Sequence, residues 1–159
     1  MKTEGEFNRF LGKEFRKMKP DLFHIKISDR FQNGVSDFLL IKEGKAVALE
    51  VKFLKKVGSG ESRLLSHPFT GTQLSFFKNF ALSGGKAFGL IAVAEQRKVY
   101  ILPFSGIGTG NWSKNEFRKY AEVFSEFNYD RRVFSFNEVN ELVSRLFKED
   151  TGDGNKEST

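Results

Sequence analysis

The sequence predicts an α/β protein with a central mixed β-sheet of about five strands flanked by α-helices. Three observations lead to this prediction. Five short apolar segments with strand character lie between residues 22 and 103, and segments with helical spacing of apolar residues precede, interrupt and follow them. The chain of 159 residues shows no shift in composition that would mark a second domain. We therefore expect one domain over residues 1–148 and a polar tail over residues 149–159.

The first half of the chain combines one helix with three strands. Apolar residues recur at helical spacing in the opening segment, and Pro20 closes it. The segment AVALEVKF is apolar on nearly both faces, as a central strand should be. The expected elements are a helix over residues 3–18, strands over 22–28 and 35–41, a turn at Glu43-Gly44-Lys45 and a strand over 46–53.

The second half begins with a long polar loop and continues with helices around a hairpin. The glycine-rich segment 105–111 lacks the Gly-Lys-Ser/Thr ending of a phosphate-binding loop, so we interpret it as a linker. The expected elements are a loop over residues 55–70, a helix over 72–82 that stops at Ser83-Gly84-Gly85, a hairpin of strands 86–94 and 98–103, and helices over 113–124 and 136–147.

Composition narrows the function classes. The excess of 26 Lys and Arg over 20 Asp and Glu gives a formal charge of +6, which favours polyanionic partners, although a solvated basic surface would look the same. Without cysteine, neither a disulfide nor a thiolate metal site can form, and His24 and His67 show no zinc-site pattern. The opening MKTEGEFNRF is polar, and no stretch approaches membrane-spanning length. We expect a soluble, cytoplasmic protein with no membrane partner and no organic cofactor.

Charged residues interrupt the central strand. Because side chains alternate along a strand, Glu50 and Lys52 share one face. If the tight turn pairs Glu43 with Ala46, the antiparallel register places Asp37 opposite Lys52 and diagonal to Glu50. Three charged side chains are then expected at one place on the sheet.

Two neighbouring carboxylates repel each other unless a cation lies between them, and their hard oxygen atoms suit Mg²⁺, with Mn²⁺ as a substitute. Such an ion can bind a phosphate oxygen and lower the pKa of a bound water, while Lys52 orients or deprotonates that water. This chemistry is phosphodiester hydrolysis. The alternative is an ordinary cross-strand salt bridge between Lys52 and Asp37 or Glu50 on a solvated face.

The segments Gly34-Val35-Ser36-Asp37 and Glu50-Val51-Lys52 together resemble the PD-(D/E)xK nuclease signature, with Ser36 in place of the name-giving proline. Thr72-Gln73, Ser83-Gly84-Gly85-Lys86-Ala87-Phe88 and Val99-Tyr100-Ile101-Leu102-Pro103 extend the resemblance, over residues 3–103, to Holliday-junction resolvases of the RecU type. The stalk insertion of RecU is not evident, and the compactness is nearer to archaeal Hjc-type resolvases.

The resemblance implies a restriction-endonuclease-like fold and a Mg²⁺-dependent endodeoxyribonuclease of DNA recombination and repair. Such an enzyme resolves four-way junctions by paired symmetric nicks. A four-way junction is nearly two-fold symmetric and needs two cuts, so a homodimer is implied as well. The Phe-rich C-terminal helices are then candidates for the interface.

Further site residues also follow from the resemblance. It places Gln73 beside the metal and a glutamate of the first helix among the metal ligands, next to Asp37 and Glu50. Helical angle favours Glu4, with Glu14 in reserve, whereas Glu6 points further out. A carboxylate near a helix N-terminus is also favoured on its own account, which is the alternative for Glu4.

Basic residues near the motif are candidates for DNA contacts. Lys26 precedes the motif loop in a Lys-x-x-Asp spacing with Asp29 that recurs in RecU-like sequences, and the loop after the catalytic strand should open beside the site. Solvated charges are the alternative for all of them. The candidates are Lys26, Lys55, Lys56 and Arg63.

Two other functions remain open. A VRR-type nuclease or a restriction-like repair nuclease, acting on flaps or duplex DNA, would carry the same Asp37, Glu50, Lys52 and Gln73. A DNA-binding scaffold that kept the fold without catalysis is the alternative from another class, and the intact carboxylates and lysine argue against it.

Overall fold

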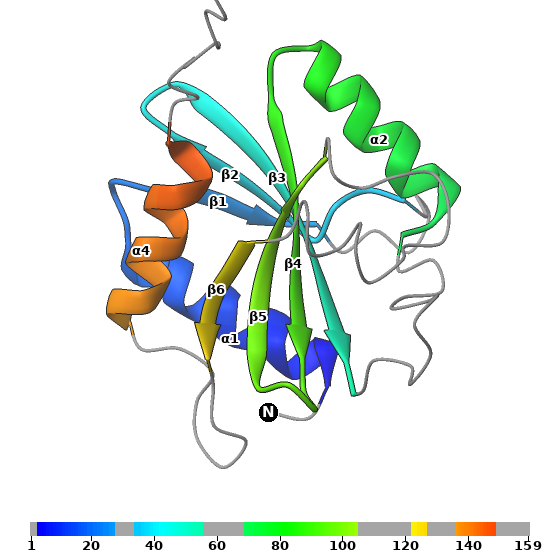
Figure 1. Ribbon diagram of the computed structural model, residues 1–159. Helices are drawn as coiled ribbons and strands as arrows, with labels where there is room; N and C mark the ends of the chain where they lie inside the picture. Colours follow the sequence, from blue (N-terminus) through cyan, green and yellow to red (C-terminus); the bar gives the residue numbers. More distant parts are fainter. Residues whose placement is uncertain (1–2, 28–33, 56–68, 105–121, 127–135, 149–159) are drawn as a thin grey trace, which may run out of the picture.

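The computed structural model describes residues 3–27, 34–55, 69–104, 122–126 and 136–148 (Figure 1). Its helices are α1 (Glu4–Lys17), α2 (Gly71–Leu82) and α4 (Phe136–Phe147). Its strands are β1 (Phe23–Lys26), β2 (Phe38–Lys42), β3 (Lys45–Leu54), β4 (Lys86–Val93), β5 (Lys98–Pro103) and β6 (Glu122–Glu126). No helix in these ranges is long and apolar enough to cross a membrane.

The six strands form one sheet in chain order, β1 to β6. β3 and β4 are parallel and every other neighbouring pair is antiparallel, so the sheet is mixed, as expected. The parallel pair requires a crossover, and α2 lies in that connection between β3 and β4. The expected α/β fold and all five expected strands are confirmed.

The helices cover the two faces of the sheet. α1 and α4 pack on one face of the sheet. Phe7, Leu11 and Phe15 of α1 are fully buried there, in one hydrophobic cluster with the β3 residues Val47, Leu49 and Val51. α2 packs on the other face, where Phe77 lies in a second cluster with Ala48 and Ile91. Glu50 and Lys52 share the face of Ala48, so they lie on the α2 side of β3.

The hairpin between β2 and β3 corrects the expected register. Glu43 and Gly44 have positive φ angles of 49° and 74°, and Lys42 pairs with Lys45, so the turn is a two-residue loop with a type I′-like backbone. The expected pairing of Glu43 with Ala46 is therefore wrong by two residues. Phe38 pairs with Leu49, and the continued register sets Asp37 beside Glu50 instead of opposite Lys52. Because the shift is even, all side chains keep their expected faces.

The sixth strand was not expected. Residues 122–124, the predicted end of a helix over 113–124, belong instead to β6, which pairs antiparallel with β5. This edge of β5 offers unpaired backbone groups, and Val123 and Phe124 are residue types that favour strands, so pairing outweighs helical spacing here. The remainder of that predicted helix, the linker 105–111 and the tail 149–159 lie outside the described residues.

Candidate active site

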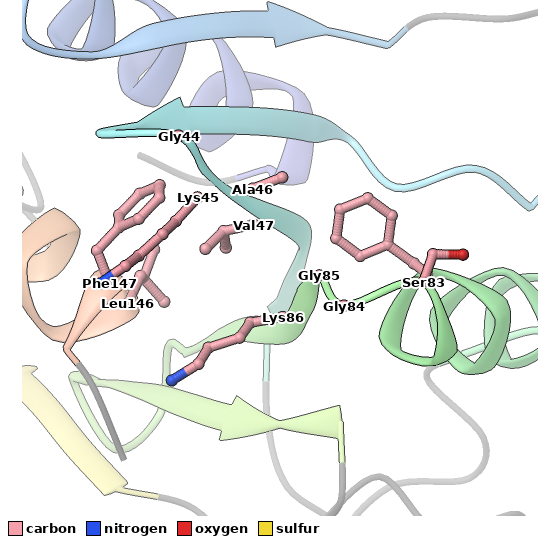
Figure 2. A pocket seen from close by; sticks show the side chains of 11 residues that line it. Gly44, Lys45, Ala46, Val47, Ser83, Gly84, Gly85, Lys86, Leu146 and Phe147 are labelled. Atoms are coloured by element: carbon pink, nitrogen blue, oxygen red, sulfur yellow. The ribbon is translucent and has the colours of Figure 1, made fainter. Parts of the chain in front are cut away.

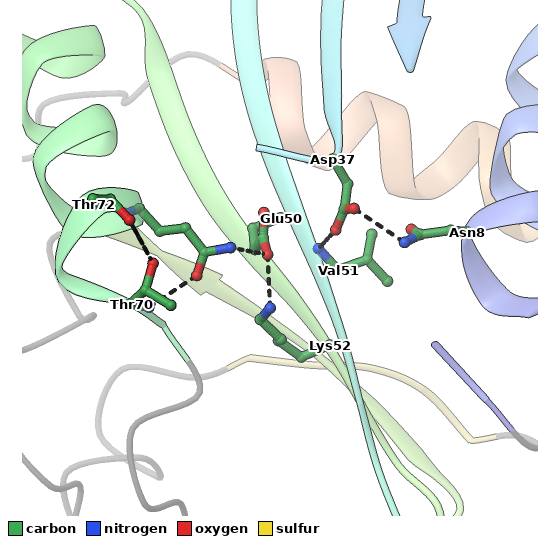
Figure 3. A network of polar contacts seen from close by, with 8 residues as sticks. Asn8, Asp37, Glu50, Val51, Lys52, Thr70 and Thr72 are labelled. Carbon is green, nitrogen blue, oxygen red and sulfur yellow. Dashed lines mark hydrogen bonds and ion pairs between the residues drawn. The ribbon is translucent and has the colours of Figure 1, made fainter. Parts of the chain in front are cut away.

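β3 fixes the first two side chains of the site. Glu50 and Lys52 are two residues apart and point from the same face of the strand, and the Lys52 Nζ lies 2.7 Å from Glu50 Oε1 (Figure 3). Glu50 is only 3% exposed, although it is a carboxylate, while 17% of the Lys52 side chain is exposed. A buried carboxylate next to a partly open lysine is costly without further partners.

Asp37 directly precedes β2, and its side chain contacts β3. Its Oδ2 accepts a hydrogen bond of 2.9 Å from the backbone N–H of Val51, and its Oδ1 accepts one of 3.1 Å from the Asn8 amide. Asp37 is thus fixed between β3 and α1 (Figure 3). Sequence analysis missed Asn8. The available signal was its position, since it is a polar residue on the α1 stripe that also carries Leu11 and Phe15.

Gln73 reaches the site from the first turn of α2. It forms a capping box with Thr70: the Gln73 backbone N–H donates to Thr70 Oγ1, and the Gln73 Oε1 accepts from the Thr70 backbone N–H at 2.9 Å. The remaining group of the amide, Nε2, donates to Glu50 Oε1. The capping box therefore orients the Gln73 side chain so that its amide N–H is directed to the buried Glu50 carboxylate.

The electrostatics of the site follow from burial and close charges. Burial, reinforced by the neighbouring Asp37, raises the pKa of Glu50 to about 7. Burial also raises the pKa of Asp37, against the opposing effects of the Val51 N–H and the Lys52 charge. Burial alone would lower the pKa of Lys52, but the carboxylates of Glu50, Glu4 and Asp37 together outweigh it and the net pKa is raised. Burial therefore disfavours the ionised forms of Asp37 and Glu50, whereas the neighbouring carboxylates favour the protonated form of Lys52.

Two buried side-chain oxygens, Oε2 of Glu50 and Oδ1 of Asn8, have no hydrogen-bond partner among the described residues. A cation held between Asp37 and Glu50 would satisfy Oε2 of Glu50, and carboxylate oxygens are hard donors of the kind that Mg²⁺ prefers. Asp37 and Glu50 therefore fit a divalent cation. No cluster of three His, Cys, Asp or Glu side chains able to hold a metal occurs among the described residues.

The glutamates expected from the first helix lie in different surroundings. Glu4 is the first residue of α1 and is partly buried, and its charge contributes to raising the pKa of both Glu50 and Lys52. Glu6 is exposed. Glu14 is buried six residues beyond Asn8 and forms a 2.7 Å ion pair with Lys17. Glu4 is the glutamate of the three whose charge reaches the site.

The predicted DNA contacts are described in part. Lys26 is exposed at the end of β1, and its charge acts to lower the pKa of Asp37, so it lies near the site. Lys55 is exposed directly after β3. Lys56, Arg63 and Asp29 lie outside the described residues.

A pocket at the other end of β3 has different chemistry. Its volume is about 300 Å³, and no carboxylate lines it (Figure 2). Its lining consists of Gly44, Lys45, Ala46, Val47, Phe80, Ser83, Gly84, Gly85, Lys86, Leu146 and Phe147. The described groups suited to hydrolysis gather around Glu50 and not in this pocket.

Comparison with known proteins places the fold. The chain is similar to the structure of Hjc from Archaeoglobus fulgidus, a Holliday junction resolvase from an archaeal hyperthermophile, with a TM-score of 0.52 and 15% sequence identity. The similarity covers 73% of this chain and 93% of that one. No protein-family model and no curated protein matches the sequence. The chain therefore has the restriction-endonuclease-like fold of Hjc, and the fold implied by the sequence resemblance is confirmed.

Proposed function

We propose that this protein is a Mg²⁺-dependent endodeoxyribonuclease that resolves four-way DNA junctions by paired symmetric nicks. The observation that carries the proposal is the state of Glu50. It is a buried carboxylate with a raised pKa. Lys52 and Gln73 bind one of its oxygens, and the other has no hydrogen-bond partner in the described part of the chain. Such a group is expensive in a purely structural role and is suited to hold a cation.

Each residue has a distinct task in this proposal. Asp37 and Glu50 hold Mg²⁺, which when bound polarises the scissile phosphate and acidifies a water. The Val51 N–H and the Asn8 amide fix Asp37, and Gln73 fixes Glu50. The raised pKa of Lys52 keeps it protonated at neutral pH, so we assign it to orient the attacking water and stabilise negative charge on the phosphate, rather than to remove a proton.

Substrate choice rests on charge and on the likeness in fold. The formal charge of +6 attracts DNA. Lys26 is exposed close enough to Asp37 for its charge to lower the pKa of that carboxylate, and Lys55 is exposed directly after β3, so both could bind backbone phosphates. The similar Archaeoglobus protein is a Holliday junction resolvase. Two symmetric cuts require two active sites, so the protein is proposed to act as a homodimer.

The test is cleavage of a labelled synthetic four-way junction beside linear duplex, single strand, flap and splayed-arm DNA of matched sequence. Each substrate is incubated with Mg²⁺, with Mn²⁺, with chelator and with the Asp37→Asn variant. Salt is held near physiological strength, because a basic protein binds all DNA at low salt. Paired symmetric nicks on the junction that require metal and Asp37 would establish the proposal.

Other outcomes of this test would indicate a different function. Preferential cutting of flaps or duplex would make it a repair nuclease of the same fold. Tight junction binding with no cleavage under either metal would overturn catalysis and leave a DNA-binding scaffold.

A further inference from the structure

We propose that a row of basic side chains along α1 and the neighbouring strands β1 and β2 holds the phosphate backbone of one duplex arm of the DNA. This inference rests on the proposed nuclease function and deepens it, because it names the surface that binds the substrate away from the cut. We call this surface the basic edge. Its residues are Arg9, Lys13, Arg16, Lys19, Lys26 and Lys42.

The helix α1 contributes a basic ridge to this edge. Arg9, Lys13 and Arg16 are exposed, and their spacing of four and three residues places them on one stripe of the helix. The stripe lies opposite the side that α1 buries against the sheet. At 1.5 Å per residue, the ridge is about 10 Å long. Arg9 directly follows Asn8, whose amide donates to Asp37, so one end of the ridge lies on the turn of α1 that contacts the site.

The strand β1 runs beside the ridge and carries a second link to the site. The ring of His24 lies 5.9 Å from that of Phe15, so His24 is on the α1 side of the sheet. Because side chains alternate along a strand, Lys26 is on the same side. Its charge also acts to lower the pKa of Asp37. Lys26 therefore connects the basic edge to the carboxylates.

The other end of the edge lies where α1 ends. Lys42 shares the α1 side of β2 with the buried Leu40, and together with Lys19 it lines a hollow of about 280 Å³. Lys17 also lines this hollow, and Asp21 is the one acidic side chain in its described lining. Positive charge therefore predominates at this end as well.

The charges of the basic edge are not compensated within the described part of the chain. None of its six residues forms an ion pair there, in contrast to Lys17, Lys52 and Arg145. The effect is visible at His24: burial lowers its pKa, and the charges of Lys19 and Arg16 lower it further. Like charges held together destabilise the folded protein, and a bound polyanion would relieve the repulsion.

Duplex DNA matches this surface in charge and in length. A duplex carries one negative charge per about 1.7 Å of its axis, so it has roughly six phosphates along the length of the α1 ridge. The basic edge also begins beside Asp37, where the scissile phosphate binds in the proposed function. An arm that leaves the site along α1 and β1 therefore meets a basic side chain at each step.

The test compares DNA binding by the variant Arg16→Gln/Lys19→Gln with that of a control of equal charge, Lys78→Gln/Lys148→Gln, whose lysines are exposed outside the basic edge. Each protein is titrated with a labelled four-way junction in chelator, so that no strand is cut, at several salt concentrations. Each lost phosphate contact reduces the slope of log K against log salt by about 0.9. The edge variant should therefore lose about 1.8 in slope and roughly tenfold in affinity at physiological salt, whereas the control should match the wild type.

Two further measurements separate an arm contact from damage to the fold or to the site. The melting temperature of the edge variant should not fall, because the substitutions remove repulsion between exposed side chains. With Mg²⁺, this variant should cut at the wild-type rate when protein saturates the junction, and more slowly below saturation. A slower rate at saturation would show that these residues act on the active site and would overturn the inference.

The binding results have equally clear meanings. Equal losses by the edge variant and the control would show that net charge alone attracts DNA, and the defined surface would be wrong. Wild-type binding by the edge variant would also overturn the inference, while cleavage by the wild-type protein in the same assay would leave the nuclease standing. A wild-type protein that neither binds nor cuts the junction would remove the proposed function as well.

Discussion

Lys52 Nζ lies 2.7 Å from Oε1 of Glu50, while Oε2 of the same carboxylate has no hydrogen-bond partner among the residues that the structure describes. The two residues are fixed to one face of β3 by strand alternation, so this arrangement depends on only three consecutive residues. It divides the tasks of the carboxylate. One oxygen compensates the lysine charge, and the other is available to the cation of the proposed function.

The division predicts that Lys52→Met separates catalysis from metal binding. Methionine keeps most of the apolar stem but loses the charge near the scissile phosphate, so turnover should fall by roughly 10²-fold or more. Mn²⁺ binding should persist, because Asp37 and Glu50 remain. Single-turnover cleavage and Mn²⁺ titration of the same preparation measure the two effects. Lys78→Met, at an exposed position of α2, is the matched control. Equal loss of binding and turnover would contradict the assigned role of Lys52.

Gln73 combines a structural and a chemical contact, and two variants separate them. Thr70→Ala removes the cap hydroxyl and should lower the free energy of unfolding by about 1 kcal/mol, with little effect on turnover. Gln73→Glu keeps an acceptor for the Thr70 N–H but replaces the donor to Glu50 with a carboxylate. The added negative charge should raise the pKa of Glu50 further and move the pH dependence of cleavage upward.

Urea denaturation and pH–rate profiles of both variants check this separation. A Thr70→Ala variant that loses turnover in proportion to Gln73→Glu would show that capping alone explains the contact. An unchanged pH profile for Gln73→Glu would mean that Gln73 does not influence Glu50.

Gly34 links the loop before Asp37 to the helix that carries Gln73. Its φ is 118°, and a Cβ added to it would lie 2.4 Å from the Cβ of Thr72. Gly34→Ala should therefore destabilise the protein by about 1–3 kcal/mol. It should also change the position of Asp37 relative to the helix that carries Gln73, and so reduce cleavage. Gly44→Ala is the control, because Gly44 also has a positive φ but open space around it. The Gly44→Ala variant should show a somewhat lower melting temperature in thermal denaturation and an unchanged turnover. Equal turnover in both variants would exclude a positioning role for Gly34.

The sequence was a good guide where a local pattern decides the structure. Strand alternation determines that Glu50 and Lys52 share a face, and the apolar stripe of α1 determines its buried side. The register error was two residues, which changes the strand partners but not the faces of the residues in β2. The register itself depends on which two residues take positive φ, and Glu43 is not a residue type that signals this conformation.

Long-range contacts were harder to predict. Asn8 and Asp37 are 29 residues apart. The position of Asn8 on the apolar stripe of α1 indicates a buried side chain, but it does not identify Asp37 as the partner. The resemblance implied a metal-binding glutamate in the first helix, and helical angle then favoured Glu4 over the other glutamates. β6 was missed because a strand at this position depends on pairing with the edge strand β5, which is a long-range contact that residues 122–126 alone do not reveal.

The raised pKa of Glu50 predicts opposite pH dependences for stability and for metal binding. Without metal, folded Glu50 ionises at about pH 7 and the unfolded residue near 4.5, so the proton stabilises the folded state below pH 4.5, and this stability is lost as pH rises to about 7. At about 1.4 kcal/mol per pKa unit, the loss is at most about 3.5 kcal/mol. Asp37, whose pKa is also raised, contributes in the same direction.

Cation binding reverses this trend, because Mg²⁺ binds the carboxylate and competes with the proton. Thermal denaturation between pH 5 and 8 should show a declining melting temperature in chelator, and a stabilisation by Mg²⁺ that grows through pH 7 together with the cleavage rate. Glu50→Gln cannot ionise, so it should lose both the Glu50-dependent decline and most of the Mg²⁺ stabilisation. A wild-type protein stabilised equally by Mg²⁺ at pH 5 and pH 8 would show that the cation does not bind at Glu50.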